Sequence, residues 1–186
     1  MDFIEDQEVV DALLDKAKAF ALEHGYEYLM GPTNYTTNET AGILVEGFNE
    51  PPKILMTYNK PYYGQLLENY GLKKEMDLYA YMIPTANASE KSLRIADVVE
   101  TRLKQKGITI RNVNIKDIDN EAKRIQKVYN EAWDENWGFV PFTDAEFEYL
   151  KNDLKMLIDP KFTYIAEKNG EPIGFGITLP NINEIL

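Results

Sequence analysis

The sequence predicts an α+β fold, and three observations support this class. Apolar residues recur at helical spacing in several segments, each bounded by residues that begin or end helices. Two apolar runs flank Asn169-Gly170, a dipeptide that favours the tight turn of a β-hairpin. Further short apolar runs, bounded by Gly, Pro, Asn and Thr, have the composition of strands. We therefore expect helices and short strands along the whole chain.

The first half is predicted to hold two helices on either side of a loop-rich region. Asp6 caps the first helix and Gly25 ends it, so that His24 lies in its last turn. The second helix lies within 61–71, with Pro61 at its start and Gly71 just past its end. A loop region as long as 33–61 is usually functional or disordered, and its tyrosines and apolar runs favour function. Four runs are expected to be extended: 26–30, 42–48, 53–59 and the later half of 72–83.

The second half begins after Pro and small polar residues at 84–89, where we place a domain junction. A helix runs from there to Gly107, and a strand follows at 108–114. Two more helices are predicted, at 119–133 and from a capping box at Thr143 and Glu146 to Asp159-Pro160. Phe142 and Phe147 occupy the positions of a hydrophobic staple. The closing hairpin is marginal alone and should require a third strand.

Composition excludes several classes of protein. The 186 residues contain no cysteine, so disulfides, thiolate metal sites and cysteine nucleophiles are all absent. No apolar run approaches the roughly 20 residues that span a bilayer, and the acidic N-terminus does not resemble a signal peptide. We therefore expect a cytoplasmic chain with no membrane partner.

The charge distribution argues against a nucleic-acid partner. The formal net charge is −11, whereas proteins that bind phosphate backbones usually present a basic surface. The segment 91–127 is an exception, with a local charge of +5. Two interpretations stay open for it: an anion-binding surface, or a solvated helix surface.

The side chains available restrict the chemistry. The single histidine lies at a helix end and the two serines, Ser89 and Ser92, lie near the junction, so a Ser-His-Asp triad is disfavoured. One histidine cannot form a histidine-rich metal site. A carboxylate site for a hard cation stays open, but no spacing supports one, so we predict no metal. No phosphate-binding motif occurs, and Gly174 and Gly176 lie inside a strand. Carboxylates, amides and 12 tyrosines remain, which suffice for proton transfer during direct group transfer.

Four stretches carry a resemblance to a known family: GPTNYTTNETAGILVEGF, YNKPYY, YNEAWDENWGFVP and AEKNGEPIGFG. They resemble the GNAT superfamily of N-acetyltransferases, and more narrowly a bacterial family that carries two GNAT-like units in tandem. The resemblance implies a GNAT-like mixed sheet flanked by helices, incomplete or composite. It assigns 1–84 to the closing half of a first unit, 85–106 to a linker and connecting helix, and 107–186 to the opening half of a second unit.

The resemblance implies an N-acyltransferase that moves an acetyl group from acetyl-CoA to a small-molecule amine or a peptide. GNAT enzymes hold the cofactor pyrophosphate in a loop reading R/Q-x-x-G-x-G/A at a helix N-terminus. This loop is missing here; it should precede Asp2 or follow Leu186. We therefore expect a segment of a longer protein or the product of a truncated gene, and expect acetyl-CoA to be held poorly by this chain alone.

Two residues are candidates for the proton transfers that the resemblance implies. Many GNAT enzymes place a catalytic tyrosine where this chain has Leu67, and Tyr63 lies one turn earlier on the same helix face. Tyr63 is either the acid or a packing tyrosine, and both interpretations stay open. Glu46 is either a base or an exposed strand carboxylate.

The candidates for substrate binding lie in the loop region and between the last two helices. We interpret Trp133 as core and Trp137, with its neighbours, as the wall of a substrate cleft. Turn chemistry and core packing remain the alternative interpretations for all of these residues. The candidates are Asn34, Asn38, Glu39, Tyr58, Asn59, Tyr62, Asn136, Trp137 and Phe139.

Two other functions stay open. The missing pyrophosphate loop favours a non-catalytic GNAT-like module for binding or assembly. The abundance of Trp, Tyr and Asn in an acidic chain suggests a carbohydrate-binding module, although such modules are usually all-β. Each half would expose unpaired backbone groups, so we expect the halves to pair within one chain, in a homodimer, or with missing parts of a longer chain.

Overall fold

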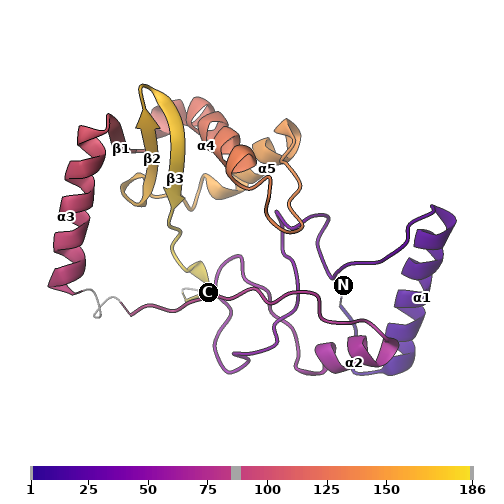
Figure 1. Cartoon of the computed structure of the whole chain (residues 1–186). Coiled ribbons are helices and arrows are strands. Elements are labelled where there is room, and N and C mark those ends of the chain that lie inside the picture. The colour runs from indigo at the N-terminus through magenta and orange to yellow at the C-terminus, as the bar shows by residue number, and fades with distance from the viewer. Residues whose placement is uncertain (1, 85–88, 185–186) are drawn as a thin grey trace. The chain divides into compact units, whose positions relative to one another are not determined.

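The structure is a computed structural model that describes residues 2–84 and 89–184 (Figure 1). Its contacts divide the chain into two compact units. Unit 1 comprises Met1–Asp77, Gly138–Val140 and Asn181–Leu186, and unit 2 comprises Leu78–Trp137 and Pro141–Pro180. The helix predicted to connect the two halves belongs to unit 2. The GNAT-like halves at 1–84 and 107–186 stay predictions.

Unit 1 contains two α-helices, α1 (Gln7–Glu23) and α2 (Tyr62–Tyr70), which pack against each other. The predicted ends are confirmed. The Asp6 side chain accepts a hydrogen bond from the Glu8 amide, and His24 caps the other end with Nδ1 2.9 Å from the Phe20 carbonyl oxygen. Gly71 ends α2 in the left-handed conformation, at φ 111°.

The buried core of unit 1 lies between these helices and the start of the chain. It contains Phe3, Val10, Leu14, Tyr63 and Leu67. Only part of the predicted apolar stripe of α1 is covered, because Phe20 remains 58% exposed.

The predicted strands of unit 1 are absent. Residues 26–30, 42–48 and 53–59 form no strand, and within the described part of this unit the only pairing of strand type is an isolated bridge between Thr33 and Ala41. The run at 72–83, which continues into unit 2, also forms no strand. These strand predictions were wrong because alternation favours an extended backbone but does not provide the neighbouring strand that a ladder requires. A composite sheet within one chain is therefore not formed by the described residues.

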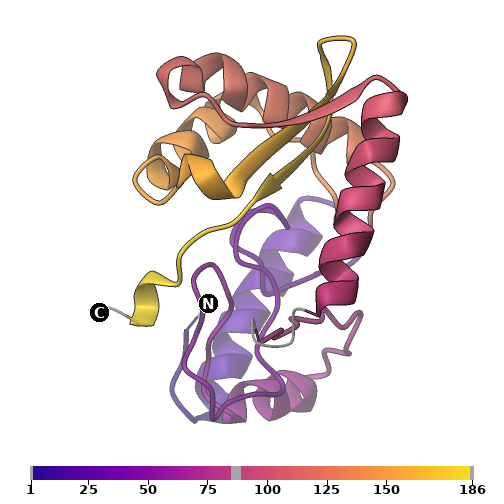
Figure 2. The ribbon, with the colours of Figure 1, turned by 90° about the vertical axis from the view of Figure 1, so that its left-hand side faces the viewer.

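Unit 2 contains three α-helices and a three-stranded antiparallel sheet (Figures 1 and 2). The helices are α3 (Glu90–Gln105), α4 (Ile118–Ala132) and α5 (Asp144–Leu154), so α5 ends before the predicted Asp159-Pro160. The strands are β1 (Ile108–Asn112), β2 (Thr163–Lys168) and β3 (Glu171–Ile177), in the order β1-β2-β3. Short 3₁₀ helices among the described residues lie at Ile115–Asp117, Pro160–Phe162 and, within unit 1, Ile182–Glu184.

The hairpin turn and its third strand are confirmed. Asn169 and Gly170 have φ values of 55° and 83°, as a tight primed turn requires. β1 pairs with β2 in register Ile110 to Ala166, and β2 pairs with β3 in register Ile165 to Phe175. The β1 pairing supplies the third strand that the hairpin alone lacks.

The predicted start of α5 is also confirmed. The Glu146 side chain accepts from the Thr143 amide at 2.9 Å, and the Glu146 amide donates to the Thr143 hydroxyl at 3.3 Å. The hydrogen bond from the Thr143 amide holds the pKa of Glu146 below its usual value. The Phe142 and Phe147 rings meet edge to face with centroids 5.5 Å apart, as the staple predicts.

The core of unit 2 lies between the sheet and α4, around Val113, Ile125 and Ile165. Helix α3 contributes no buried residue, and its contacts run to β1. Leu93 and Ile95 on α3 are 62% and 53% exposed. The helix predicted at this place is correct, but its apolar face remains uncovered.

A cluster of four charged side chains joins the sheet of unit 2 to α4. Arg111 on β1 donates two hydrogen bonds to the Glu121 carboxylate, at 2.6 and 2.9 Å, and a third to Glu167 on β2 at 2.7 Å. Arg124 donates to the same Glu167 oxygen at 3.0 Å and to the carbonyl oxygen of Gly170 in the hairpin turn. Glu121 is buried, and it also accepts from the Asn114 amide. Forked guanidinium contacts of this kind fix both distance and orientation.

These contacts shift the pKa of both carboxylates downwards. The hydrogen bond from Arg111 is the largest cause for Glu121 and for Glu167, and burial opposes it in both cases. The same two partners raise the pKa of Arg111. The cluster is therefore fully charged at neutral pH.

Glu121→Gln should destabilise unit 2 by about 2 kcal/mol, because it weakens charged hydrogen bonds to a group that is already buried. Urea unfolding followed by tryptophan fluorescence measures the change. Glu135→Gln, at an exposed position, is the matched control and should leave the midpoint unchanged. Equal midpoints for the two variants would show that the cluster does not stabilise the fold.

The cluster also predicts how stability depends on pH. The pKa values of Glu121 and Glu167 are lower in the folded chain than the value of about 4.3 for unfolded glutamate. Their contribution is therefore complete above about pH 4.3 and is lost as the pH falls through the lowered folded values. Urea unfolding at a series of acidic pH values should show this loss. Glu121→Gln should flatten the dependence, and Glu135→Gln should retain it.

Candidate functional site

The loop at Thr33–Ala41 in unit 1 holds the short segment Gly138–Val140. The loop is closed at its base by hydrogen bonds from the Asn34 amide to the Thr40 carbonyl and from the Gly42 amide to the Pro32 carbonyl. From its tip, the Thr37 hydroxyl donates to the Gly138 carbonyl and the Asn38 side-chain nitrogen donates to the Val140 carbonyl, both at 2.7 Å. Two of the stretches that carry the family resemblance are thus brought together.

Gly138 is required at this contact for two physical reasons. Its φ of 67° lies in the left-handed region, which side chains disfavour. A Cβ atom at this position would lie 3.1 Å from the Thr37 methyl carbon. The contact therefore depends on a residue without a side chain.

Asn59 is occupied by the backbone rather than open to a ligand. Its side-chain oxygen accepts from the Leu44 amide at 2.6 Å, and its side-chain nitrogen donates to the carbonyls of Leu44 and Lys60. The residue is buried. The Asn59 side-chain amide thus makes the hydrogen bonds that a neighbouring strand would make, and it fixes the loop to the start of α2.

In unit 2, the side-chain amide of Asn130 likewise bonds to the backbone of a loop. The sequence did not single out this residue. Its side chain accepts from the Phe142 amide at 3.0 Å and donates to the Phe142 carbonyl at 3.2 Å. The link between α4 and α5 is thereby tied to α4. A polar residue on the helix next to a loop was the available signal.

The hydroxyls of Tyr62 and Tyr63 both contact the start of the chain. Tyr62 donates to the Phe3 carbonyl at 2.9 Å. Tyr63 accepts from the Phe3 amide at 3.3 Å and donates to the Asp2 carboxylate at 3.1 Å. The Phe3 ring stacks on Tyr63 with centroids 4.1 Å apart. The Tyr63 hydroxyl is therefore covered by Asp2 and Phe3.

The environment of Tyr63 keeps its hydroxyl protonated. Burial is the largest cause that raises its pKa, and the hydrogen bond from the Phe3 amide opposes it. A protonated phenol is the form that a general acid requires. The acid role predicted from the sequence is chemically consistent, but it requires Asp2 and Phe3 to move away.

The other loop candidates are exposed side chains of unit 1. Glu46 is exposed, which agrees with the interpretation of this residue as a surface carboxylate. It lies in a loop, however, and not in a strand. Tyr58 is 52% exposed, and Asn34 and Glu39 are also exposed. Within the described part of the unit, no hydrogen bond joins any of these side chains to Tyr63.

The tryptophan interpretation needs one correction. Trp133 is not core: it is 47% exposed and its ring stacks on Tyr129, with centroids 5.2 Å apart. It is the C-cap residue that follows Ala132, beyond the buried positions of α4, which end at Val128. Trp137 is 41% exposed, Asn136 is exposed, and Phe139 is partly buried. Their role as a cleft wall stays a prediction.

Tyr35 is a further residue that the sequence did not single out. It lies in the loop at Thr33–Ala41 with φ 70°, and it is 92% exposed. A bulky residue in the left-handed region is uncommon, and such outliers cluster at functional sites. Its aromatic side chain inside the stretch GPTNYTTNET was the only available signal.

The helix starts of this chain do not fit the diphosphate of coenzyme A. Such a group binds backbone N–H groups at a helix N-terminus that is free of negative charge. Four α-helices carry acidic residues in the first turn, namely α1, α3, α4 and α5. Among the described α-helices only α2, which has nine residues, lacks them, and it begins with Tyr62 and Tyr63. No cradle for the diphosphate is present in the described residues.

Clustered metal ligands and membrane-spanning helices are both lacking in the described residues. No group of three or more potential metal ligands comes together in residues 2–84 and 89–184. No helix in this part of the chain combines the length and apolar character needed to cross a membrane.

Two curated proteins are similar to the chain over nearly all of its residues. Protein YghO of Escherichia coli (strain K12) is 35% identical over 188 residues, which cover 100% of this chain and 47% of that protein. The bacterial ceramide synthase of Caulobacter vibrioides (strain NA1000 / CB15N) is 32% identical over 185 residues, which cover 98% of this chain and 47% of that protein. The chain thus spans about half the length of the curated relatives it matches. No protein-family model and no solved structure matches it.

The contact between Thr37 and Gly138 can be tested with a pair of glycine variants. Gly138→Ala and Gly47→Ala both place an alanine at positive φ, but only the first meets a neighbouring atom. We expect Gly138→Ala to lose about 1 kcal/mol more stability than Gly47→Ala, because the added methyl group overpacks the contact. Urea unfolding of both variants measures the difference. Equal losses would show that the loop does not hold Gly138 closely.

Proposed function

We propose that the chain forms part of an N-acyltransferase, which transfers an acyl group from a coenzyme A thioester to an amine. The observation that carries this proposal is the 32% identity to a bacterial ceramide synthase over 98% of the chain. A ceramide is by definition an amide of a long-chain amino alcohol, so its synthesis joins an acyl group to an amine. The resemblance of the sequence to GNAT enzymes supports the same reaction class.

The arrangement of unit 2 agrees with what the resemblance implies for the opening half of a GNAT-like unit. A strand, two helices and a hairpin follow one another as β1, α4, α5, β2 and β3. Within unit 1, we assign the acid role to Tyr63, because it lies on α2 one turn before Leu67, the position where the resemblance implies a catalytic tyrosine. In this role it would donate a proton to the departing thiolate, while Glu46 or water accepts the proton of the amine.

A non-catalytic module is the second candidate, and one observation favours it. Asn59 and Tyr63 are both engaged by the backbone or by the start of the chain, so two of the predicted site residues make structural contacts. A chain that uses these side chains for packing would keep the architecture without the reaction. The two candidates differ in whether thioester is consumed.

The proposal is tested by measuring amine-dependent release of free thiol from an acyl thioester. The chain contains no cysteine, so a thiol-reactive dye gives no signal from the protein itself. We expect release with a long-chain amino alcohol as acceptor. We also expect acyl-pantetheine to react within about threefold of acyl-CoA, because the described residues hold no diphosphate and that group should then bring little binding energy. Absence of release with both donors would favour the non-catalytic module.

The role of Tyr63 is tested with a matched pair of variants. Tyr63 and Tyr70 each lie on α2 and donate a hydrogen bond to an aspartate, Asp2 and Asp15 respectively. Tyr63→Phe should lower the rate about 100-fold, and Tyr70→Phe should leave it unchanged. Equal rates for the two variants, at equal melting temperature, would remove Tyr63 from the reaction.

A further inference from the structure

Asp2 and Phe3 of unit 1 lie across the hydroxyl groups of two neighbouring tyrosines of α2. We refer to these two residues as the covering segment. The Tyr62 hydroxyl donates to the Phe3 carbonyl at 2.9 Å. The Tyr63 hydroxyl accepts from the Phe3 amide at 3.3 Å and donates to the Asp2 carboxylate at 3.1 Å. Both phenols are thus engaged by one short stretch of the chain.

A single buried side chain anchors the covering segment. Phe3 is 8% exposed, whereas Asp2 is exposed and the following Ile4 is 65% exposed. The Phe3 ring belongs to the buried cluster of unit 1 and stacks on Tyr63 with centroids 4.1 Å apart. Withdrawal of this one ring would therefore free the segment and leave an apolar space beside the Tyr63 hydroxyl.

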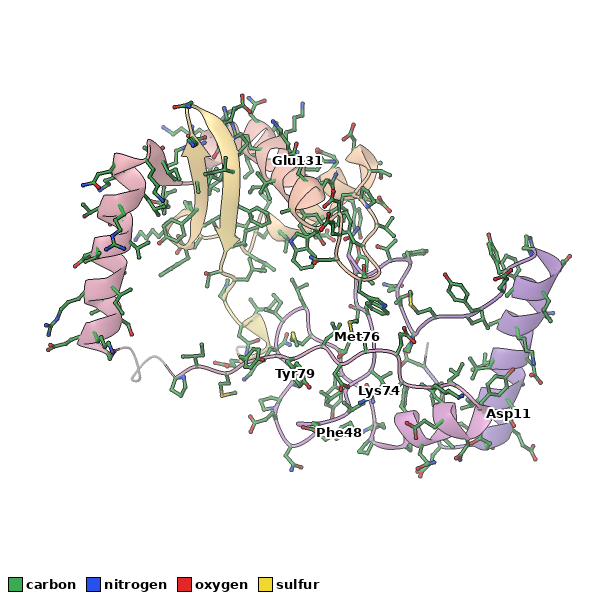
Figure 3. The ribbon with its side chains drawn as sticks, in the orientation of Figure 1. Asp11, Phe48, Lys74, Met76, Tyr79 and Glu131 are labelled. Atoms are coloured by element: carbon green, nitrogen blue, oxygen red, sulfur yellow. The ribbon has the colours of Figure 1, made fainter. Side chains whose placement is uncertain are left out.

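The two helices around this ring are held together by contacts that do not involve it. The Gln7 side chain donates to the Asp11 carboxylate at 2.7 Å and to the Leu66 carbonyl of α2 at 3.1 Å. The Tyr70 hydroxyl of α2 donates to Asp15 of α1 at 2.7 Å. Asp11 is labelled on α1 in Figure 3, where the two helices lie side by side. The apolar space would therefore keep its walls when the ring leaves.

The groups that Phe3 presents to this site are also those of an acyl thioester. Phe3 offers a carbonyl oxygen to Tyr62 and places an apolar group in the buried cluster. A fatty acyl thioester likewise joins a carbonyl oxygen to an apolar chain, whose removal from water is favourable. The covering segment thus matches the reacting end of an acyl donor in both its polar and its apolar part.

We propose that the covering segment occupies the acyl subsite of the transferase and that the acyl donor displaces it. This inference rests on the proposed function and adds the place where the donor binds. The first carbons of the acyl chain take the space of the Phe3 ring. The Tyr62 hydroxyl, released from the Phe3 carbonyl, donates to the thioester carbonyl oxygen.

Displacement of the segment also frees the acid for the reaction. The amine nitrogen bonds to the carbonyl carbon, the carbon–sulfur bond breaks, and the leaving sulfur takes the proton of Tyr63. Glu46 or water accepts the proton that the amine loses, and solvent returns a proton to Tyr63. Negative charge develops on the carbonyl oxygen during this step, and a hydrogen bond from Tyr62 to that oxygen stabilises it.

The covering segment therefore competes with the donor. The apparent affinity for a ligand is lower than the intrinsic affinity by the fraction of molecules that are competent to bind it. A change that weakens the segment, and leaves both tyrosines in place, should strengthen donor binding. Ordinary core packing of Phe3 makes the opposite prediction, because the loss of a core side chain does not improve a binding site.

The first test compares Phe3→Ala with Leu14→Ala, which removes a side chain of the same buried cluster and leaves the phenols covered. The melting temperature is measured against the concentration of acyl-pantetheine, with no amine present. Phe3→Ala should lower the half-maximal concentration about tenfold, and Leu14→Ala should leave it unchanged. Equal values for the two variants would overturn the proposal.

A milder pair of variants serves where loss of the ring unfolds the chain. Asp2→Ala removes the carboxylate that accepts from Tyr63, and Glu5→Ala removes another exposed carboxylate close by in the chain. Asp2→Ala should lower the half-maximal concentration of acyl-pantetheine about threefold, and Glu5→Ala should leave it at the native value. An Asp2→Ala value equal to that of Glu5→Ala would contradict competition by the segment.

Displacement itself can be observed by NMR spectroscopy of the backbone amides. At saturating acyl-pantetheine, the amide signals of Phe3 and Ile4 should move to the positions of an unstructured chain. The signals of Tyr62 and Tyr63 should shift and remain those of a helix. Signals of Phe3 and Ile4 that keep their positions at saturation would show that the donor binds elsewhere, and the proposal would then be wrong.

Tyr62→Phe separates this proposal from the proposed function. It should lower kcat for thiol release about 100-fold without raising KM for the donor, because it removes both the donor to the carbonyl oxygen and an anchor of the segment. Tyr70→Phe is the control. Thiol release with native kcat in Tyr62→Phe would retain the transferase and overturn the subsite. Displacement of the segment with no thiol release from the native chain would retain the subsite and contradict the transferase.

Discussion

Every extended backbone segment needs hydrogen-bond partners for its N–H and C=O groups. The two units meet this need in different ways. In unit 2 the strand β1 pairs with the β2–β3 hairpin, and the Arg111 cluster ties the sheet to α4. In unit 1 the described residues contain no sheet, so side chains provide part of the pairing. The amide of Asn59 bonds to both backbone groups of Leu44, and Thr37 and Asn38 bond to carbonyls of Gly138 and Val140.

The sequence predicted correctly those features whose hydrogen bonds form between residues that are close together in the chain. The cap at Asp6, the capping box at Thr143 and the turn at Asn169-Gly170 are of this kind, because each places its hydrogen-bonding groups close together in the chain. The runs at 26–30 and 72–83 have suitable composition for strands, but strand formation also depends on a distant segment. Sequence periodicity contains no information on whether that segment is available. The strands expected at 26–30 and 72–83 therefore failed, whereas β1 and the β2–β3 hairpin of unit 2, which pair with one another, were confirmed.

The candidate site was predictable to a similar extent. Tyr62, Tyr63 and Asn59 were identified as a polar and aromatic group, and the structure does place them at the start of α2. What the sequence could not show is which partners these groups already have. A tyrosine hydroxyl is equally suited to a substrate and to the Asp2 carboxylate, and an asparagine amide is equally suited to a ligand and to a peptide group. Tyr35 and Gly138 became notable only when their backbone angles were known.

The acidic composition has two opposite consequences at the helix starts. Carboxylates in the first turn stabilise α1, α3, α4 and α5 by interacting with the positive end of each helix dipole. The same carboxylates repel a diphosphate from the backbone groups that would bind it. The residues that stabilise these helices thus exclude one end of coenzyme A from them. Under the proposed function, an acyl donor would therefore contact the described residues through its acyl and pantetheine portions, which carry no charge, rather than through its diphosphate.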